Sequence, residues 1–443
     1  MHGEMYGEMH GEEWMMTAYS EWGKQQLQEE LDLLVKHYEG FKAQGLKLNM
    51  ARGKPAPEQL DLSNKMLQAL PADARPLDRN GEDTRNYGLL LGIPEARELM
   101  GQILGAPASE VLIGGNSSLN LMYDTVARSM LFGVRGSVPW CQLDTVKFLC
   151  PAPGYDRHFA VTQSLGIENV AVAMTVDGPD MDAVCELVQT DPAIKGIWCV
   201  PKYSNPQGYT YSEQVVRRFA GLVPAASDFR IFWDNAYAVH DLVEPGDALL
   251  SLREACLEAG TGDSYYMFSS TSKVTFAGGG ISALATSADN LAEIQQHLSF
   301  QTIGHDKVNQ LRHVRFLGDL LGVKAQMRRQ AALIAPKFQL VLEAFDRELA
   351  GLGVARWTRP NGGYFISFDG LTGTAARTVL LAKEAGVALT GAGATYPYGI
   401  DPDDSNIRIA PTYPSLEELA LACELFCLCV RIAALEKLLS PRA

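Results

Sequence analysis

The octapeptide YMFSSTSK (residues 266–273) is the most informative stretch of this 443-residue chain, and its last residue is Lys273. Its apolar and aromatic first half predicts a buried strand, and its hydroxyl-rich second half predicts a turn at the end of that strand. An amine at a strand end can react with the aldehyde of a cofactor, while Ser270, Ser272 and the N–H groups of the turn hold a phosphate. A lysine after serines is by itself more typical of a solvated loop, so this interpretation depends on the segments around it.

Two earlier strand ends carry side chains that suit the same cofactor. Asp234 follows the apolar run at residues 231–233, where a carboxylate can pair with a protonated ring nitrogen and keep the ring electron-accepting. Tyr237 and Asn205, the latter in an Asn-Pro turn after the apolar run at residues 194–200, can donate hydrogen bonds to the phenolic oxygen of such a ring. Alternatively, Asp234 caps the next helix and Asn205 belongs to an ordinary turn.

A glycine-containing turn upstream completes the set. Gly115, Asn116 and Ser117 stand between a predicted strand and a predicted helix that begins near Leu119. Glycines let the backbone approach a phosphate, and a helix N-terminus supplies free N–H groups and a favourable dipole, although Gly-Gly before a helix is common. All four segments lie at strand ends, and ligands of an open α/β sheet bind at the carboxyl ends of its strands. We therefore expect the four segments to converge.

The alternation of strand and helix patterns predicts an α/β fold. Between about residues 95 and 290, short apolar runs alternate with helical segments, which indicates a mostly parallel sheet between helices. We expect a large cofactor-binding domain over residues 63–319 and a smaller α+β domain over residues 320–443, which an N-terminal arm at residues 17–62 joins because it is too short to fold alone. Residues 1–16 repeat Gly-Glu-Met and predict a disordered extension.

Composition excludes several classes of function. A formal net charge of −14 argues against a nucleic-acid partner, because binding to phosphate backbones needs a concentrated basic surface. The chain has no run of about 18 uncharged apolar residues, so no membrane span is expected. The eight cysteines lack the paired spacing of a zinc site, and no metal is predicted. We interpret the cysteines as reduced core residues, and the sequence has no export signal, so the cytoplasm is the expected location of the protein.

These segments together resemble the fold-type I, class I aminotransferases, which depend on pyridoxal 5′-phosphate (PLP). The likeness extends from about residue 46 to residue 414 and is closest to aspartate aminotransferase subgroup Ic. It implies the PLP-transferase fold type I, PLP as cofactor, and Lys273, Asp234 and Tyr237 as catalytic residues. The implied reaction moves an amino group between an amino acid, with aspartate- or glutamate-like substrates favoured, and a 2-oxo acid.

The resemblance also assigns roles that chemistry alone does not single out. Gly53 matches a glycine beside the substrate, and Arg408 matches the arginine that grips the substrate α-carboxylate, with Asn205 as a neighbour. Tyr155 matches the aromatic residue that stacks on the pyridine ring. Tyr87 matches the tyrosine that reaches the cofactor phosphate of the neighbouring subunit, so we expect a homodimer with shared active sites.

One position departs from the family pattern. Class I enzymes usually carry a phosphate-binding arginine eight residues after the lysine, and Ile281 occupies that position here. The phosphate charge must then be balanced in another way, by the glycine-rich backbone, Tyr87 or residues 302–305.

Other functions compete with transamination. β-Lyases, decarboxylases and synthases share this scaffold, and a PLP-binding regulator would need a DNA-binding domain for which the 45 residues before Leu46 leave little room. The sequence does not show what selects the substrate side chain. Candidates are Arg52, Lys54, His305, Arg312 and Arg315.

Overall fold

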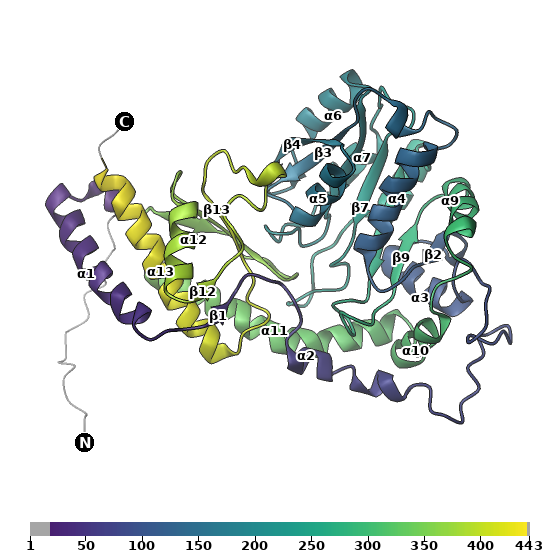
Figure 1. The fold of residues 1–443 in the computed structure, drawn as a ribbon, viewed down its shortest axis with the longest axis horizontal. Helices are drawn as coiled ribbons and strands as arrows, with labels where there is room; N and C mark the ends of the chain where they lie inside the picture. The colour runs from purple at the N-terminus through teal and green to yellow at the C-terminus, as the bar shows by residue number, and fades with distance from the viewer. Residues whose placement is uncertain (1–17, 441–443) are drawn as a thin grey trace.

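The structure is a computed structural model that describes residues 18–440. The extension predicted at residues 1–16 lies outside the described residues. Two parts lie side by side, a large sheet between helices and a smaller part with a three-stranded sheet and long helices (Figure 1). The arrangement confirms the predicted α/β fold class, with a mostly parallel sheet between helices in the large part.

The large sheet has eight strands in the order β2-β9-β8-β7-β6-β3-β4-β5. β4, β3, β6, β7 and β8 run parallel, whereas β9 is antiparallel to both of its neighbours. The carboxyl ends of the parallel strands therefore meet at one edge. The strands are β2 (Val111–Ile113), β3 (Lys147–Ala152), β4 (Glu168–Thr175), β5 (Gly178–Pro179), β6 (Ile194–Cys199), β7 (Arg230–Asp234), β8 (Tyr265–Ser270) and β9 (Ser282–Ala285).

Helices cover both faces of this sheet, which explains why its strands are apolar on both sides. In β7, Ile231 and Trp233 pack on the core under α3, α6, α7, α8 and α10, whereas Phe232 packs on the core under α4, α5 and α9. The helices are α3 (Pro94–Leu104), α4 (Ser118–Phe132), α5 (Asp156–Ser164), α6 (Met181–Thr190), α7 (Glu213–Ala220), α8 (Leu252–Ala259), α9 (Ala288–Gln301) and α10 (Lys307–Leu317).

The smaller part joins the N-terminal segment to the C-terminal third of the chain. One core contains residues of α1, α11, α12 and α13 together with the antiparallel sheet β10-β11-β13. β1 pairs in parallel with β12, and α1 packs along α13 (Figure 1). The elements are α1 (Lys24–Lys42), β1 (Leu48–Asn49), α2 (Pro57–Asp61), α11 (Leu320–Leu349), β10 (Ala355–Trp357), β11 (Ile366–Gly370), α12 (Ala375–Glu384), β12 (Val387–Ala388), β13 (Asn406–Ile409) and α13 (Leu416–Leu439), and the short 3-10 helices are Tyr19–Glu21, Asn64–Gln68, Ala108–Glu110, Trp140–Gln142 and Pro397–Gly399.

The 30-residue helix α11 connects the two parts. Near its start, Val323 and Met327 belong to a core of the large part, whereas Ile334 and Phe345 belong to the core of the smaller part. A domain boundary at residue 320 stays a prediction, because this helix runs without a break through both cores. Among residues 18–440, no helix combines the length and apolarity that crossing a bilayer requires.

Candidate active site

A cavity of 520 Å³ lies where the two parts meet, beside the carboxyl ends of β7 and β8. Both parts contribute to its wall, because Lys273 comes from the turn after β8 and Arg408 comes from β13. The sequence-predicted residues that line it are Gly53, Ser117, Tyr155, Asn205, Asp234, Tyr237, Ser270, Ser272, Lys273 and Arg408.

Lys273 lies in this cavity beside two tyrosine rings. Its Nζ is 5.1 Å from the ring centroid of Tyr237 and 5.6 Å from that of Tyr364. Burial lowers the pKa of Lys273 and Arg408 lowers it further, while the charge of Asp234 acts in the opposite direction. A lysine with a lowered pKa is more often uncharged near neutral pH, and an uncharged amine can act as a nucleophile or a base.

Asp234 ends β7 and is 3% exposed. Its Oδ2 lies 3.0 Å from Nε2 of His158, whose ring stacks on Trp198 with centroids 4.6 Å apart. Its Oδ1 is buried and has no hydrogen-bond partner in the structure. A buried carboxylate oxygen without a donor is costly, so this atom calls for a donor from a molecule in the cavity.

The wall around Asp234 fits the PLP that the sequence implies. The unpartnered Oδ1 suits a protonated ring nitrogen, and Tyr155 supplies an aromatic ring. Burial raises the pKa of Tyr237 well above its usual value, so its hydroxyl stays protonated and able to donate. Asn205 lies on the same wall.

A second group of polar atoms suits a phosphate. Ser117 is the N-cap of α4 but makes no side-chain cap hydrogen bond, so the first N–H groups of this helix are available to an anion. Ser270 Oγ donates to Ser272 Oγ over 3.1 Å, and Ser272 Oγ donates to the carbonyl of Asn116 over 2.9 Å. The carbonyl of Gly115 accepts from the backbone N–H of Ser282 over 2.7 Å. The Asn116 carbonyl thus connects this turn to the turn after β8, and the Gly115 carbonyl connects it to the start of β9.

Arg408 projects from β13 toward the other wall. Its Nη1 donates to Asp156 Oδ1 over 2.8 Å and to Asn205 Oδ1 over 3.3 Å, and its guanidinium lies over the ring of Phe365. Its Nε is buried and has no partner among the residues that the structure describes. The guanidinium is therefore held in place while part of its donor capacity stays unused.

Gly53 allows the N-terminal segment to pass close to this arginine. A Cβ at this position would lie 2.4 Å from Phe365 Cζ, which is closer than atoms can pack. A larger residue would displace Phe365, whose ring lies under the Arg408 guanidinium.

Several positions that the sequence singled out do not line the cavity, among them Gly115, Asn116, Tyr87 and Ile281. Tyr87 is 82% exposed and does not line the cavity. Ile281 is 1% exposed and belongs to an apolar core, and its backbone N–H donates to Thr271 Oγ1 over 2.9 Å. Within residues 18–440, the arginines and lysines on the cavity wall are Arg52, Arg157, Lys273 and Arg408.

Sequence reasoning missed several residues of the site. His158 follows Tyr155 by three residues, which is about one helical turn and therefore a usable signal. Arg157 lines the cavity as well, but a single exposed arginine carries no such signal. Tyr364 and Phe365 reach the site from the other part of the molecule, through packing that no local pattern reveals.

Comparisons with known proteins agree with this geometry. The family described as aspartate amino-transferase matches residues 23–442. A putative aminotransferase from Mycolicibacterium smegmatis is 51% identical over 432 residues, 96% of this chain and 100% of the relative. An aspartate aminotransferase from Corynebacterium glutamicum is 48% identical over 91% of this chain and 93% of its own length. The crystal structure of an aspartate transaminase from C. glutamicum superposes with a TM-score of 0.92 at 46% identity, over 95% of this chain and 99% of that one.

Proposed function

The chain belongs to the aspartate aminotransferase family and is a PLP-dependent transaminase, and from this premise we propose that Lys273, Asp234 and Arg408 carry the reaction on a dicarboxylic amino acid. The reaction moves an amino group between an amino acid and a 2-oxo acid. Relatives named as aminotransferases over nearly the full chain favour this reaction over the β-lyase, decarboxylase, synthase and regulator alternatives.

One observation carries the assignment of residues. The unpartnered Oδ1 of Asp234, the Lys273 amine and the guanidinium of Arg408 all belong to the wall of one cavity. When bound, PLP supplies an aldehyde that takes up the amino group and a ring that accepts electrons from the α-carbon. Asp234 would hold the proton on the ring nitrogen, with His158 fixing the orientation of its carboxylate.

Lys273 would hold the cofactor and move the proton at the substrate α-carbon. This task needs an amine that can be uncharged, which agrees with the lowered pKa of Lys273. Tyr237 and Asn205 would donate to the phenolic oxygen. Tyr155 would cover a face of the ring and so exclude water.

Arg408 would bind the substrate α-carboxylate through its planar guanidinium. Asp156 and Asn205 already occupy one of its nitrogens, which fixes the plane of the group before substrate arrives. A pre-oriented arginine holds the substrate at a defined angle, and orientation supplies a large part of an enzymatic rate.

The phosphate would lie at the N-terminus of α4, with Ser117, Ser270 and Ser272 as hydroxyl donors and the backbone near Gly115 and Asn116 beside it. The phosphate would be bound by N–H and O–H donors, because Ile281 stands where related enzymes have a phosphate-binding arginine.

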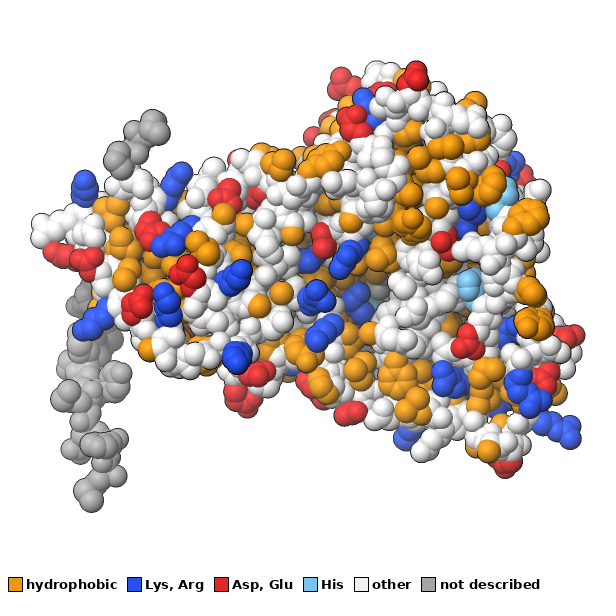
Figure 2. Space-filling view, viewed as in Figure 1, with side chains coloured by type: hydrophobic (Ala, Val, Ile, Leu, Met, Phe, Trp, Pro, Cys, Tyr) orange, Lys and Arg blue, Asp and Glu red, His pale blue; other side chains and the backbone are white. Residues whose placement is uncertain are grey.

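The substrate class follows from the charge around the cavity. Arg52 and Arg157 line it, both are exposed, and neither forms an ion pair within the described part of the chain. Figure 2 shows Lys and Arg side chains gathered around the central hollow, although the net charge of the chain is −14. A basic rim on an acidic protein attracts anionic substrates, and a second carboxylate on the substrate would pair with one of these arginines.

The test compares aspartate with alanine as amino donor in Arg52→Gln and Arg157→Gln variants. Losing a charged hydrogen bond costs about 2 kcal/mol, so we expect kcat/KM for aspartate to fall more than tenfold in at least one variant, while kcat/KM for alanine changes little. Lys54→Gln is the matched control, because Lys54 is an exposed neighbour that lies over Tyr413 and does not line the cavity. Equal losses for both donors would refute this choice of substrate class.

Assembly belongs to the same proposal, and a homodimer with shared active sites explains the exposed apolar side chains near Tyr87. Phe300 is 83% exposed and Ile303 is 61% exposed. Gly304 approaches Gly88 so closely that a Cβ on Gly304 would lie 2.6 Å from the Gly88 carbonyl oxygen, so the two loops are adjacent. A second copy of the chain would cover this patch and bring Tyr87 to its own phosphate group.

The cytoplasm is the proposed location, because all eight cysteines are free and six of them are buried. Such thiols are typical of a reducing compartment.

A further inference from the structure

A second cavity, of 860 Å³, opens at the opposite edge of the large sheet. Arg230 and Tyr265, the first residues of β7 and β8, lie on its wall. The same two strands end at Asp234 and Ser270, so the length of the sheet separates this cavity from the one described above. No step of the proposed transamination uses it.

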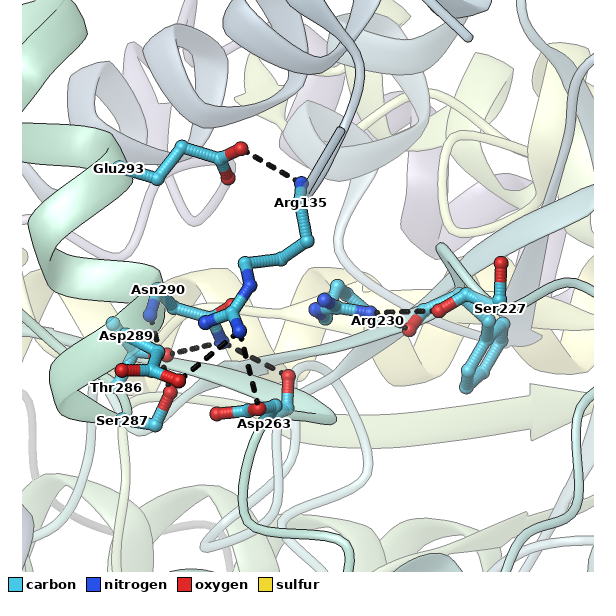
Figure 3. Close-up of polar contacts among 10 residues, drawn as sticks. Arg135, Ser227, Arg230, Asp263, Thr286, Ser287, Asp289, Asn290 and Glu293 are labelled. Atoms are coloured by element: carbon cyan, nitrogen blue, oxygen red, sulfur yellow. Dashed lines mark hydrogen bonds and ion pairs between the residues drawn. The ribbon is translucent and has the colours of Figure 1, made fainter. Parts of the chain in front are cut away.

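Arg230 is a buried cation with no acidic partner. The residue is 5% exposed, and no carboxylate of the described residues lies within ion-pair distance of it. Its Nη1 donates to the carbonyls of Phe229 over 2.8 Å and Ser227 over 3.3 Å, and its Nε has no partner (Figure 3). A buried charge without a counter-charge is costly.

The neighbours of Arg230 do not supply the missing negative charge. Burial raises the pKa of the Tyr266 hydroxyl, and this effect outweighs the charge and the hydrogen bond of Arg230, which lower that pKa. The hydroxyl is therefore neutral. Glu293 also acts on this hydroxyl and accepts a hydrogen bond from the backbone N–H of Arg135 over 2.7 Å. Neither Glu293 nor any other carboxylate of the described residues forms an ion pair with Arg230.

The acidic groups of the cavity wall already have partners. Arg135 forms ion pairs with Asp289 and Asp263 (Figure 3). The distances from its Nη2 are 3.0 Å and 4.0 Å. Arg253 binds Glu110 through two hydrogen bonds of 2.6 and 2.8 Å. None of these carboxylates forms an ion pair with Arg230.

We propose that this cavity binds a small organic oxyanion, a carboxylate or a phosphate ester, as the counter-charge of Arg230. Ser287 and Ala288, at the N-terminus of the 14-residue helix α9, lie on the same wall and add a favourable dipole. Leu222 and Leu257 also line the cavity, which suits a ligand with an apolar body. Two paired aspartates nearby disfavour a ligand with several negative charges.

The experiment titrates the holoenzyme with benzoate and, separately, with phenyl phosphate by isothermal calorimetry. These probes share a phenyl ring, so their relative affinities distinguish a carboxylate from a phosphate ligand. We expect saturable binding of at least one probe, and a loss of about tenfold or more in affinity in Arg230→Gln, because a charged hydrogen-bonded pair is lost. The Arg408→Gln variant should retain this binding, which separates it from carboxylate binding in the first cavity.

A second variant keeps the test valid if Arg230→Gln fails to fold. Ser227 is exposed and lines the cavity, so Ser227→Trp should block the site and leave Arg230 in place. Val223 lies on the same loop, is 71% exposed and does not line the cavity, so Val223→Trp should bind the probe like the unmodified protein. Absence of saturable binding, or equal affinity in Ser227→Trp and Val223→Trp, would overturn the proposal. The outcome does not depend on transaminase activity.

Discussion

Lys273 is the residue on which the proposed chemistry depends most directly. We predict that borohydride reduction of the holoenzyme fixes PLP to Lys273, because its amine lies in the cavity and burial lowers its pKa. Peptide mass mapping locates the label. Lys202, a buried lysine whose Nζ binds Asp241 over 2.7 Å, is the internal control and should stay unlabelled. A label on any lysine other than Lys273 would remove Lys273 from its proposed role, and Lys273→Ala should abolish the attachment.

Asp234 gives a second prediction at this scale. Asp234→Asn replaces the anionic partner of the ring nitrogen with a neutral amide, so we expect half-reaction rates to fall roughly a hundredfold or more. Asp228→Asn is the matched control. Asp228 is also buried and precedes the same strand, but it binds Lys195 and Trp140 at the far end of β7. Stopped-flow measurement of single turnovers gives the rates, and similar losses in both variants would show that Asp234 acts only through folding.

At the scale of secondary structure elements, α10 is attached near the active-site turn by a buried histidine. His313 is fully buried, its Nδ1 lies 2.8 Å from the Asn309 carbonyl oxygen, and its Nε2 lies 3.0 Å from Thr275 Oγ1. Burial lowers the pKa of His313 to about 4. The folded protein therefore keeps this ring neutral at a pH where the unfolded chain binds a proton.

This lowered pKa makes the folded state less stable as the pH falls. A base whose pKa is lower in the folded state stabilises the fold fully above its unfolded pKa of about 6.5, and this contribution is lost as the pH falls toward 4. We predict that lowering the pH from 7 to 5 costs about 2 kcal/mol of unfolding free energy through His313.

Urea denaturation at both pH values would check this prediction in the unmodified protein and in His313→Gln. The variant cannot take up the proton, so its unfolding free energy should fall less between the two pH values. An identical fall in both proteins would mean that His313 is not the titrating group. Comparing the two proteins cancels the contributions of all other groups.

At the scale of the whole molecule, the proposed dimer predicts complementation between inactive chains. If Tyr87 serves the phosphate group of the opposite subunit, a hybrid of Tyr87→Ala and Lys273→Ala chains contains one site with both residues intact. Mixing the two variants under conditions of subunit exchange should therefore raise activity above that of either parent.

The control mixture combines unmodified chains with chains that carry both substitutions. In that mixture each hybrid site lacks one of the two residues, so hybrids should add no activity. Mass measurement must confirm that hybrid dimers form. Activity at the weighted mean of the parents in the single-variant mixture would show that Tyr87 acts within its own chain.

The overall fold class could be predicted because its signals are local. Alternation of apolar strands and amphipathic helices is visible within a few tens of residues, and it is enough to indicate a mostly parallel sheet. The positions of Lys273, Asp234, Asn205 and Ser117 at strand ends could be predicted for the same reason. That such ends meet is a general property of parallel sheets.

The partners of these residues could not be predicted, because they come from distant parts of the chain. His158 and Asp234 are 76 positions apart, and Arg408 and Asp156 are 252 positions apart. They meet because β6 lies between β3 and β7 and because β13 folds back over the strand ends. Strand order depends on how helices pack across the sheet, and no local pattern records that packing.

The difference between what the sequence and the tertiary structure determine is greatest for residues whose role depends on a partner. Local sequence determined two of the reactive groups, Asp234 and Lys273, since each is recognised from the few residues around it, whereas Arg408 was assigned by the resemblance to a known family. Tertiary packing decided that, among the described residues, Asp234 Oδ1 and Arg230 Nε are buried without a hydrogen-bond partner. Burial and pairing are properties of three-dimensional surroundings, and these surroundings exist only after the sheet and its two layers of helices have formed.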